Sequence, residues 1–364
     1  MKVAIIGAGL AGLACAFELE RNEISPVIFE KKSYIGENYM YSSTTLRLFD
    51  RSYTNPVKYF NKKYNLNLVP FCPLKEIVMK GPSKQGAVSG RLGYVFMRGD
   101  EKNSLENQIA RHVNAPIHFD TYINVDDIKK DFDHVIVATG DETVANHLGV
   151  WHTTTTVHTR VALVLGDFKV GSAKMWVNRE YSKACYGFLS PHSKRDGRLL
   201  LSVNDISTHE FDHYWNNFAR LEEVKYKITE TRDIVTRLGY VSSVKVENIY
   251  LTGSAAGLID DFLGFGAINA IESGILAAQA IIKDKDYSEL IRPIKEHTAK
   301  IHEFRKMVNE FSNEDYDRLI KILTMPLVKR IIYNNPAAKA QNISSVARRC
   351  NNLKHKRQRR LFRS

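Results

Sequence analysis

The stretch that decides the fold is VAIIGAGLAGLACAFELERNEISPVIFE, residues 3–30. Its first four residues, 3–6, form a short apolar run typical of a buried β-strand. The run leads into Gly-Ala-Gly-Leu-Ala-Gly at 7–12, then into a helix-forming stretch and a second apolar run at 27–29 that ends in Glu30. Strand, G-x-G-x-x-G turn, helix, second strand and terminal acid within about 30 residues predict a dinucleotide-binding unit.

Each residue of this pattern has a mechanical role in such a unit. Gly7 permits the tight turn, Gly9 lets the backbone approach a pyrophosphate, and Gly12 lets helix and strand pack closely. The helix N-terminus offers free N–H groups and a partial positive charge to phosphates. Glu30, 18 residues after Gly12, is placed to accept hydrogen bonds from ribose hydroxyls. The same context argues against a signal peptide, although the apolar N-terminus has a similar composition.

Composition is that of an ordinary globular protein of 364 residues, with 44% hydrophobic and 25% charged residues. The net charge is +12, but eight Lys and Arg and no acid lie in 348–364, which leaves +4 for the rest. The four cysteines, Cys15, Cys72, Cys185 and Cys350, form no C-x-x-C pair. That spacing favours reduced thiols in a cytoplasm over disulfides or a zinc site. No apolar run approaches the roughly 20 residues that span a bilayer.

Further strands alternate with helices through the first 150 residues. Strand-like runs are expected at 93–98, 117–119, 121–123 and 131–140, with a helix at 104–112. Such alternation predicts a doubly wound, mainly parallel sheet. Beyond it, β-rich segments suggest an inserted antiparallel sheet, after which the chain returns to the first domain past Tyr226.

The return segment carries a second strong pattern. A strand at 249–252 leads into GSAAGLIDDFLGFGAI, residues 253–268, and then into a helix crowded with small residues. A strand that ends in glycines at a helix N-terminus again exposes backbone N–H groups to an anion. Four glycines and two acids in this turn are poor packing material, so a ligand-binding role is favoured.

One motif suggests a metal. His209-Glu210-Phe211-Asp212-His213 matches H-E-x-x-H, which on a helix binds zinc. Ser207 and Glu210, however, form a capping box that accounts for the glutamate, and no third ligand follows. We therefore predict no metal site.

These segments together resemble the FAD-dependent oxidoreductases of the geranylgeranyl reductase family, relatives of the aromatic-hydroxylase flavoproteins. The resemblance rests on GAGLAGLACAFELE…VIFEKK, GYVFMRGDEKNSLENQIA, VIVATG and IYLTGSAAGLIDDFLGFGAINAIESGILAAQAI, and it extends to about Lys283. It implies non-covalent FAD, with Arg98 near the flavin, Val125 at the adenine and 266–268 beside the isoalloxazine. The FAD-binding residues it implies are Gly7, Gly9, Leu10, Ala11, Gly12, Glu30, Lys31, Arg98, Val125, Ala138, Thr139, Gly140, Gly253, Ser254, Asp260, Gly264, Gly266, Ala267 and Ile268.

The chain departs from the family's pattern at several positions. Ser254 stands where the family usually has an aspartate on the ribityl chain, and Asp261 where it has a proline. Tyr186 and Phe188 lie in a stretch similar to the family's substrate-side aromatic motif, and we expect them to form an apolar wall. The family's substrate-side cysteine is missing, so the proton donor is unassigned, and water or Tyr186 could serve.

The implied fold class is α/β: a Rossmann-like FAD-binding domain with an inserted antiparallel substrate domain and a helical C-terminal region. The expected boundaries are 1–150 for the first part of the FAD-binding domain (33–90 partly on the substrate side), 151–225 for the substrate domain, 226–285 for the return, 286–347 for the helical region and 348–364 for the basic tail.

The expected activity is hydride transfer from reduced flavin to a carbon–carbon double bond of an isoprenoid or other small apolar substrate. A flavin monooxygenase acting on an apolar or aromatic substrate and a flavin mutase or isomerase without net redox stay open, as does a non-catalytic FAD-binding scaffold. Only one dinucleotide fingerprint is present, so the electron donor is transiently bound NAD(P)H or a ferredoxin. The basic tail is either a solvated, disordered end or a peripheral contact to an anionic membrane, and no specific nucleic acid is predicted.

Overall fold

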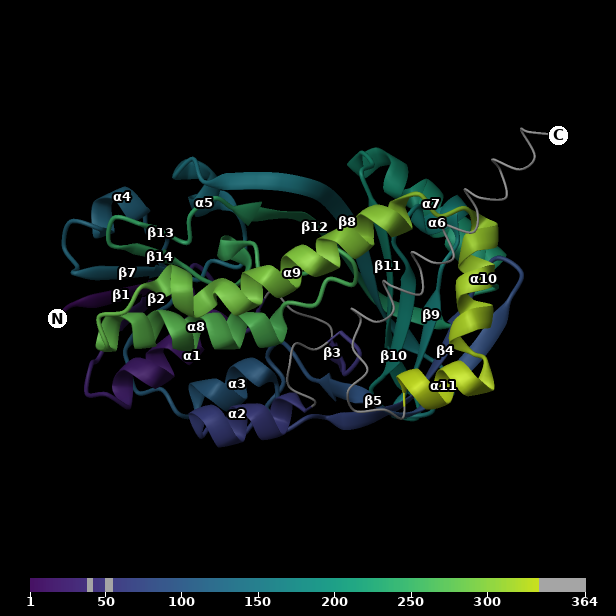
Figure 1. The fold of residues 1–364 in the computed structure, drawn as a ribbon, viewed down its shortest axis with the longest axis horizontal. Coiled ribbons are helices and arrows are strands. Elements are labelled where there is room, and N and C mark those ends of the chain that lie inside the picture. The colour runs from purple at the N-terminus through teal and green to yellow at the C-terminus, as the bar shows by residue number, and fades with distance from the viewer. Residues whose placement is uncertain (38–41, 50–54, 334–364) are drawn as a thin grey trace.

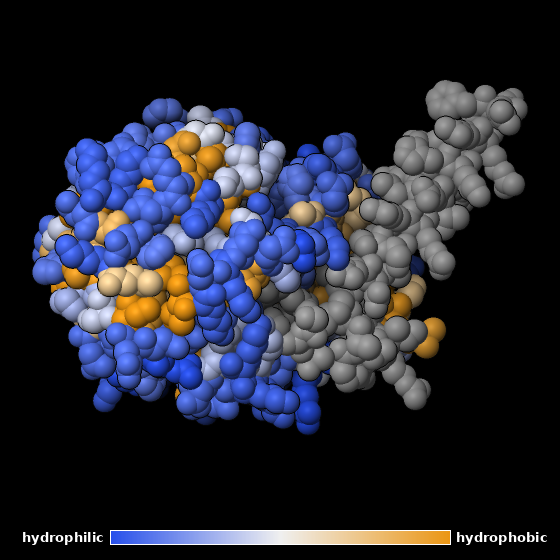
Figure 2. Space-filling model, turned by 60° about the vertical axis from the view of Figure 1, so that its left-hand side comes forward, coloured by the Kyte–Doolittle hydropathy of each residue, from blue (hydrophilic) through white to orange (hydrophobic). Residues whose placement is uncertain are grey.

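The computed structural model describes residues 1–37, 42–49 and 55–333. Two sheets lie side by side along the long axis of the molecule, and helix α9 (Tyr287–Asn309) runs from one to the other (Figure 1). Figure 2 shows a face that is mostly hydrophilic, with smaller hydrophobic areas between the polar side chains. The predicted basic tail, 348–364, and Cys350 lie outside the described residues.

The first sheet is built from the N-terminal unit that the sequence predicts. Its strand order is β13-β14-β7-β1-β2-β6, and all neighbours are parallel except β13 and β14. The strands are β1 (Val3–Ile6), β2 (Val27–Phe29), β6 (Ile117–His118), β7 (His134–Val137), β13 (Lys245–Val246) and β14 (Ile249–Leu251). All four residues of β1 are buried, as expected for a central parallel strand.

Helices α1 (Leu10–Glu20) and α8 (Ala267–Ile282) pack together on this sheet (Figure 1). A Cβ on Gly274 of α8 would lie 2.0 Å from the backbone oxygen of Ala11 in α1, so glycine permits this close approach. The other helices of this part are α2 (Pro56–Tyr64), α3 (Leu105–Ala110), α4 (Val125–Ile128) and α5 (Thr143–His147). The predicted strand at 121–123 is not formed, and those residues continue from β6 as irregular chain.

The second sheet has the strand order β12-β8-β11-β10-β9-β4-β5-β3. Its neighbours are antiparallel except β4 and β9, which are parallel, so the sheet is mixed. The strands are β3 (Ser43–Leu46), β4 (Cys72–Lys80), β5 (Gln85–Phe96), β8 (Trp151–Leu165), β9 (Ser172–Trp176), β10 (Gly187–Pro191), β11 (Asp196–Asn204) and β12 (Lys227–Val241).

Two expected boundaries are corrected by this sheet. The return to the first domain, predicted from residue 226, begins only at β13, because β12 pairs with β8 along its whole length. Strand β5 runs to Phe96 in the second sheet, past the limit of 90 set for the substrate-side segment. Both errors have one cause: β12 and β5 are long strands with exposed polar positions, and their composition does not show which sheet they join.

Helices complete the second part. Helix α6 (Arg179–Ser182), the short turn η1 (Thr208–Glu210) and α7 (Phe211–Leu221) cover one end, and α10 (Asn313–Leu323) and α11 (Pro326–Ile332) follow α9. Ser312 and Asp315 form a reciprocal capping box that starts α10. Within the described part of the chain, no helix is long and apolar enough to cross a membrane.

Candidate nucleotide and substrate cavities

The carboxyl ends of four parallel strands meet at one edge of the first sheet. The N–H of Gly7 donates to the carbonyl of Phe29 (2.7 Å), and that of Ala138 donates to Ile6 (2.8 Å). Thr252 donates in the same way to Val137 (2.9 Å). The ends of β1, β2, β7 and β14 are therefore level, which is the edge where open α/β sheets bind ligands.

The three glycines of the predicted turn differ in what the protein requires of them. Gly7 has φ +107°, and a Cβ there would lie 2.4 Å from the backbone oxygen of Ala138. A Cβ on Gly12 would lie 1.9 Å from the oxygen of Gly7. Gly9 has an ordinary φ of −81°, and apart from its two chain neighbours no heavy atom of the described residues lies within 4 Å of where its Cβ would be. Fold and packing require Gly7 and Gly12 but not Gly9.

Gly9 is also the N-cap of α1, and its cap has no side-chain hydrogen bond. The first-turn N–H groups of Leu10, Ala11 and Gly12 begin the helix there, while Leu13 is the first residue to donate back to Gly9. A helix N-terminus without a side-chain cap favours an anion.

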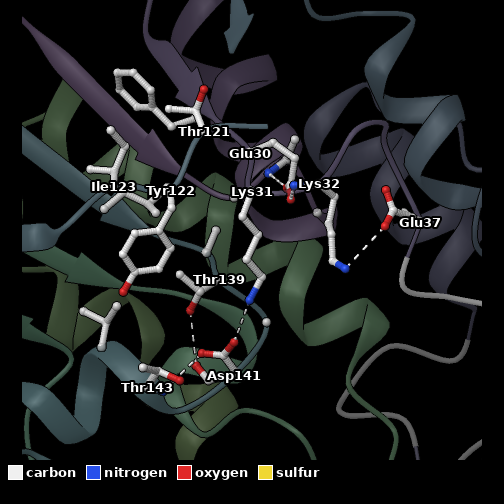
Figure 3. A pocket seen from close by; sticks show the side chains of 18 of the residues that line it. Glu30, Lys31, Lys32, Glu37, Thr121, Tyr122, Ile123, Thr139, Asp141 and Thr143 are labelled. Carbon is white, nitrogen blue, oxygen red and sulfur yellow. Dashed lines mark hydrogen bonds and ion pairs between the residues drawn. The ribbon is translucent and has the colours of Figure 1, made fainter. Parts of the chain in front are cut away.

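Glu30 lies next to this turn, at the end of β2. Its Oε2 accepts from the N–H of Ala8 (2.7 Å), and its Oε1 accepts from the N–H of Lys32 (2.9 Å). The carboxylate is therefore held over the glycine turn by backbone donors on both sides. Figure 3 shows Glu30 in the wall of the cavity that opens at this edge.

We call this the nucleotide cavity. Both lysines after Glu30 are paired across it: Lys31 with Asp141 (3.2 Å) and Lys32 with Glu37 (3.3 Å), as Figure 3 shows. Of the residues predicted from the sequence, its lining contains Gly7, Gly9, Glu30, Lys31, Ala138, Thr139 and Gly140.

Some lining residues were missed by the sequence analysis. Thr121, Tyr122 and Ile123 line the nucleotide cavity, whereas Val125 is buried in the core at the start of α4. The clue was available, because a segment that leaves the carboxyl end of a parallel strand lies at the binding edge. Glu106, also missed, lines the cavity from α3 and binds the predicted Arg98, whose Nε donates to Glu106 Oε1 (2.6 Å).

A second cavity, lined by both polar and apolar residues, lies at the N-terminus of α8, and we call it the α8 cavity. It is lined by the predicted Asp260, Gly266, Ala267 and Ile268, together with side chains from β3 and α9. Gly266, the N-cap of α8, has no side-chain cap. Asp260 shapes the preceding loop by accepting from the N–H groups of Phe262 (3.1 Å), Leu263 (2.7 Å) and Phe265 (2.7 Å). Burial raises the pKa of Asp260 to about 6 against the lowering effect of these bonds.

Comparison with known proteins supports this architecture. Residues 5–72 match the family model described as an NAD(P)-binding Rossmann-like domain. A geranylgeranyl bacteriochlorophyll reductase-like protein from Thermoplasma acidophilum superposes with a TM-score of 0.71 at 16% identity, over 91% of this chain and 93% of that one. The two chains share their fold over almost their whole length.

Other proteins of this flavoprotein fold match at similar levels. A flavoprotein/dehydrogenase from Cytophaga hutchinsonii has a TM-score of 0.63 at 15% identity, over 96% of this chain and 98% of that one. A p-nitrophenol 4-monooxygenase from Pseudomonas putida has a TM-score of 0.64 at 14% identity, over 90% and 95% of the two chains. Identities this low establish the shared fold alone.

Ser254 and Gly253 occupy the turn η2 (Gly253–Ala256), which follows β14. Gly253 has φ +56° and its N–H donates to Ser273 Oγ (2.9 Å), so its role in the described residues is to join β14 to α8. Ser254 lines a third cavity, between the end of β7 and strand β12, which we call the β12 cavity. Lys31, Thr139 and Gly140 line both the β12 and the nucleotide cavities, so the two adjoin. Gly264 belongs to none of these linings and has φ +73°.

An apolar cavity lies between the second sheet and helices α9 and α10. Its exposed lining is almost entirely carbon and comes from segments far apart in the chain. The lining residues include Leu46, Leu48, Phe49, Ile77, Met79, Val88, Leu92, Met175, Val177, Cys185, Tyr186, Phe262, Leu263, Phe304, Val308, Tyr316, Leu319, Ile320, Leu323 and Tyr333. Phe49 lines both this cavity and the α8 cavity, so the two meet there.

Of the two aromatic residues expected to form the apolar wall, only Tyr186 lines this cavity. Phe188 packs edge-to-face against Tyr186, with ring centroids 6.5 Å apart, and belongs to a small core under the second sheet. Two residues that are two positions apart share a face only where both lie in a regular strand. Phe188 lies in β10, but Tyr186 precedes it, so the two side chains need not point the same way.

The H-E-x-x-H motif forms the predicted capping box. Ser207 and Glu210 bond reciprocally at the start of η1, and His209 and His213 are exposed. Across residues 1–37, 42–49 and 55–333, no group of three His, Cys, Asp or Glu side chains is arranged to hold a metal ion. Cys15, Cys72 and Cys185 are free thiols.

Proposed function

We propose that this chain binds FAD non-covalently and is a flavin-dependent oxidoreductase that acts on an apolar substrate. The residue that best supports the cofactor is Gly9. Neither backbone conformation nor packing among the described residues requires glycine there, whereas a pyrophosphate at the α1 N-terminus does, because it lies where a side chain would project.

Separate groups of residues fit the two ends of FAD. Glu30 would hold the adenosine ribose, and the N-terminus of α1 would hold the pyrophosphate. The uncapped N-terminus of α8, residues 266–268, would present backbone N–H groups to the isoalloxazine. Arg98 and Ser254 are proposed to contact FAD between these two ends, as the resemblance to the geranylgeranyl reductase family implies.

The observation that carries the substrate class is the junction at Phe49. There the α8 cavity, the proposed flavin end, whose lining is part polar and part apolar, meets a cavity whose exposed lining is almost entirely apolar. Bound flavin supplies hydride transfer from its N5 position. The apolar cavity would position a hydrocarbon substrate at this junction, because burial contributes about 25 cal/mol per Å² without matched charges. An isoprenoid carbon–carbon double bond is the proposed acceptor.

The reduction of a double bond also requires a proton, and Tyr186 is the proposed donor. Its side chain lines the apolar cavity, and its hydroxyl bonds the loop that separates this cavity from the α8 cavity. A hydrogen donor at that boundary is within the region where a reacting double bond would lie.

A flavin monooxygenase is the second candidate, because the fold is shared with p-nitrophenol 4-monooxygenase. Oxygenation and reduction use the same cavities and differ in what the reduced enzyme reacts with. A mutase or isomerase would use the same cavities without consuming reductant.

The test begins with the absorption spectrum of the purified protein, which should show bound FAD. Photoreduced protein is then mixed with polyprenyl compounds without oxygen, and flavin reoxidation and product mass are followed. Reoxidation with a product two hydrogens heavier supports the reductase. Absence of reoxidation with every polyprenyl compound, together with rapid substrate-stimulated reoxidation by oxygen, refutes it in favour of the monooxygenase.

The sequence alone supports two further proposals, one on the electron donor and one on the basic tail. NAD(P)H or a ferredoxin is proposed to reduce the flavin, and the rate of anaerobic bleaching of the flavin with each donor tests this. The eight bases after residue 347 are proposed to bind anionic membranes, with about 1 kcal/mol per base. Truncation before Arg348 should abolish salt-sensitive binding to anionic vesicles and leave flavin reduction intact, and equal vesicle binding by the truncated protein would refute the contact.

A further inference from the structure

One carboxylate in the wall of the nucleotide cavity is only half satisfied. Glu106, the second residue of α3, has no exposed surface, and its Oε1 accepts from Arg98 Nε (2.6 Å). Its Oε2 is buried and receives no hydrogen bond from any residue of the described chain. Glu106 nevertheless lines the nucleotide cavity together with Glu30.

The other carboxylate of this wall behaves differently. Both oxygens of Glu30 accept backbone N–H groups, from Ala8 and Lys32. A buried carboxylate oxygen without a donor is costly, and native proteins rarely leave one without a partner, a bound water or a ligand. Glu106 Oε2 is thus a buried acceptor without a donor, on a residue that lines the cavity.

The charges of the cavity define what that donor is. The described lining contains four carboxylates, Glu30, Glu37, Glu106 and Asp141, and two ammonium groups. Both ammonium groups, on Lys31 and Lys32, are paired with Asp141 and Glu37. Phosphate oxygens at neutral pH carry negative charge and bring no donor, so a carboxylate repels them. A hydroxyl is uncharged and donates.

We propose that Glu106 accepts a hydrogen bond from a hydroxyl group of bound FAD and thereby fixes which part of the cofactor lies against α3. This inference rests on the proposed function. The hydroxyl belongs either to the adenosine ribose or to the ribityl chain, and ADP, which has the ribose and lacks the ribityl chain, separates the two.

The experiment measures dissociation constants for FAD and for ADP by titration calorimetry on protein stripped of cofactor. Glu106→Gln should weaken FAD binding about tenfold, because a charge-assisted hydrogen bond is roughly twice as strong as a neutral one. Equal weakening of ADP assigns the ribose hydroxyl, and weakening of FAD alone assigns the ribityl hydroxyl. If Glu106→Gln does not fold, Glu106→Asp retains the charge but withdraws it by one methylene, and weaker binding is again expected.

Glu272→Gln is the matched control. Glu272 is a buried glutamate on α8 that accepts from Tyr59 (2.5 Å) and Tyr64 (2.8 Å) and does not line the nucleotide cavity. This variant should lose folding stability with an unchanged FAD dissociation constant. If wild type binds FAD and the Glu106 variant has unchanged dissociation constants for FAD and ADP, the inference is overturned and the proposed function is not. Wild type that binds no FAD overturns the proposed function.

Discussion

The hydroxyl of Tyr186 donates a hydrogen bond to the backbone carbonyl of Leu263, 77 residues further along the chain. This bond ties the segment before β10 to the loop that Asp260 shapes by accepting three backbone N–H groups. Leu263 lines the apolar cavity, and Asp260 lines the α8 cavity. The tyrosine therefore fixes the loop that lies between the apolar cavity and the α8 cavity.

Tyr186→Phe should retain FAD, because Tyr186 does not line the nucleotide or α8 cavities. Loss of the hydrogen bond should lower the free energy of unfolding by about 1 kcal/mol. If the hydroxyl also supplies the proton, anaerobic reoxidation of the reduced flavin by substrate should slow by about 100-fold or more. Stopped-flow absorbance measures this rate, with Phe188→Leu as the control. An unchanged rate in Tyr186→Phe would remove the tyrosine from the chemistry.

Gly9→Val should abolish FAD binding and leave the apoprotein folded. The new side chain meets no described heavy atom within 4 Å of its Cβ, so its effect falls on the ligand. Gly12→Val is the contrasting variant, because its Cβ would lie 1.9 Å from the oxygen of Gly7 and should prevent folding. FAD content by absorbance and thermal unfolding of both apoproteins measure the difference. Gly9→Val protein as yellow as wild type would refute the pyrophosphate assignment.

Ser254→Asp should retain or strengthen FAD binding if Ser254 faces the ribityl chain, since a charged acceptor makes the stronger hydrogen bond to a hydroxyl. The β12 cavity that Ser254 lines contains three bases and three acids, so its charged side chains neither favour nor oppose the added carboxylate on balance. FAD titration gives the dissociation constant, with Ser242→Asp on an exposed bend as control. A folded variant that loses FAD would show that this residue does not face the ribityl chain.

His192 should make the protein sensitive to acid. Burial, reinforced by Arg198, lowers the pKa of His192 to about 4, and neither ring nitrogen has a hydrogen-bond partner in the described residues. The folded state favours the neutral ring, while the unfolded chain takes up a proton near pH 6.5. Stability is therefore full above about pH 6.5 and falls as the pH drops toward 4, by up to about 3 kcal/mol.

Replacement of His192 tests this dependence. His192→Leu should cost little at pH 7, because no described hydrogen bond is lost, and should be more stable than wild type at pH 5. Urea unfolding at both pH values measures the change, with His209→Leu on the surface as control. A pH dependence identical to that of wild type would contradict the assignment to His192.

The sequence by itself determined the first βαβ unit, the strand-to-helix turn before α8 and the capping box at Ser207. Each depends on backbone conformation within a short stretch: Gly7 needs a positive φ, Gly12 a close contact, and Ser207 a partner three residues away. Such requirements are met by residue type and spacing alone, so they can be recognised without knowing the rest of the fold.

Only the tertiary structure decided the cavity walls. Glu106 reaches the nucleotide cavity from α3, and the apolar cavity collects ordinary core-type residues from β3 to α11, none of which has a distinctive neighbour in sequence. Strand β12 belongs to the second sheet because it pairs with β8, and the sequence of a polar strand does not predict which strand it pairs with. Side chains that line a cavity are selected by the packing of distant segments, and that packing is a property of the whole chain rather than of any stretch within it.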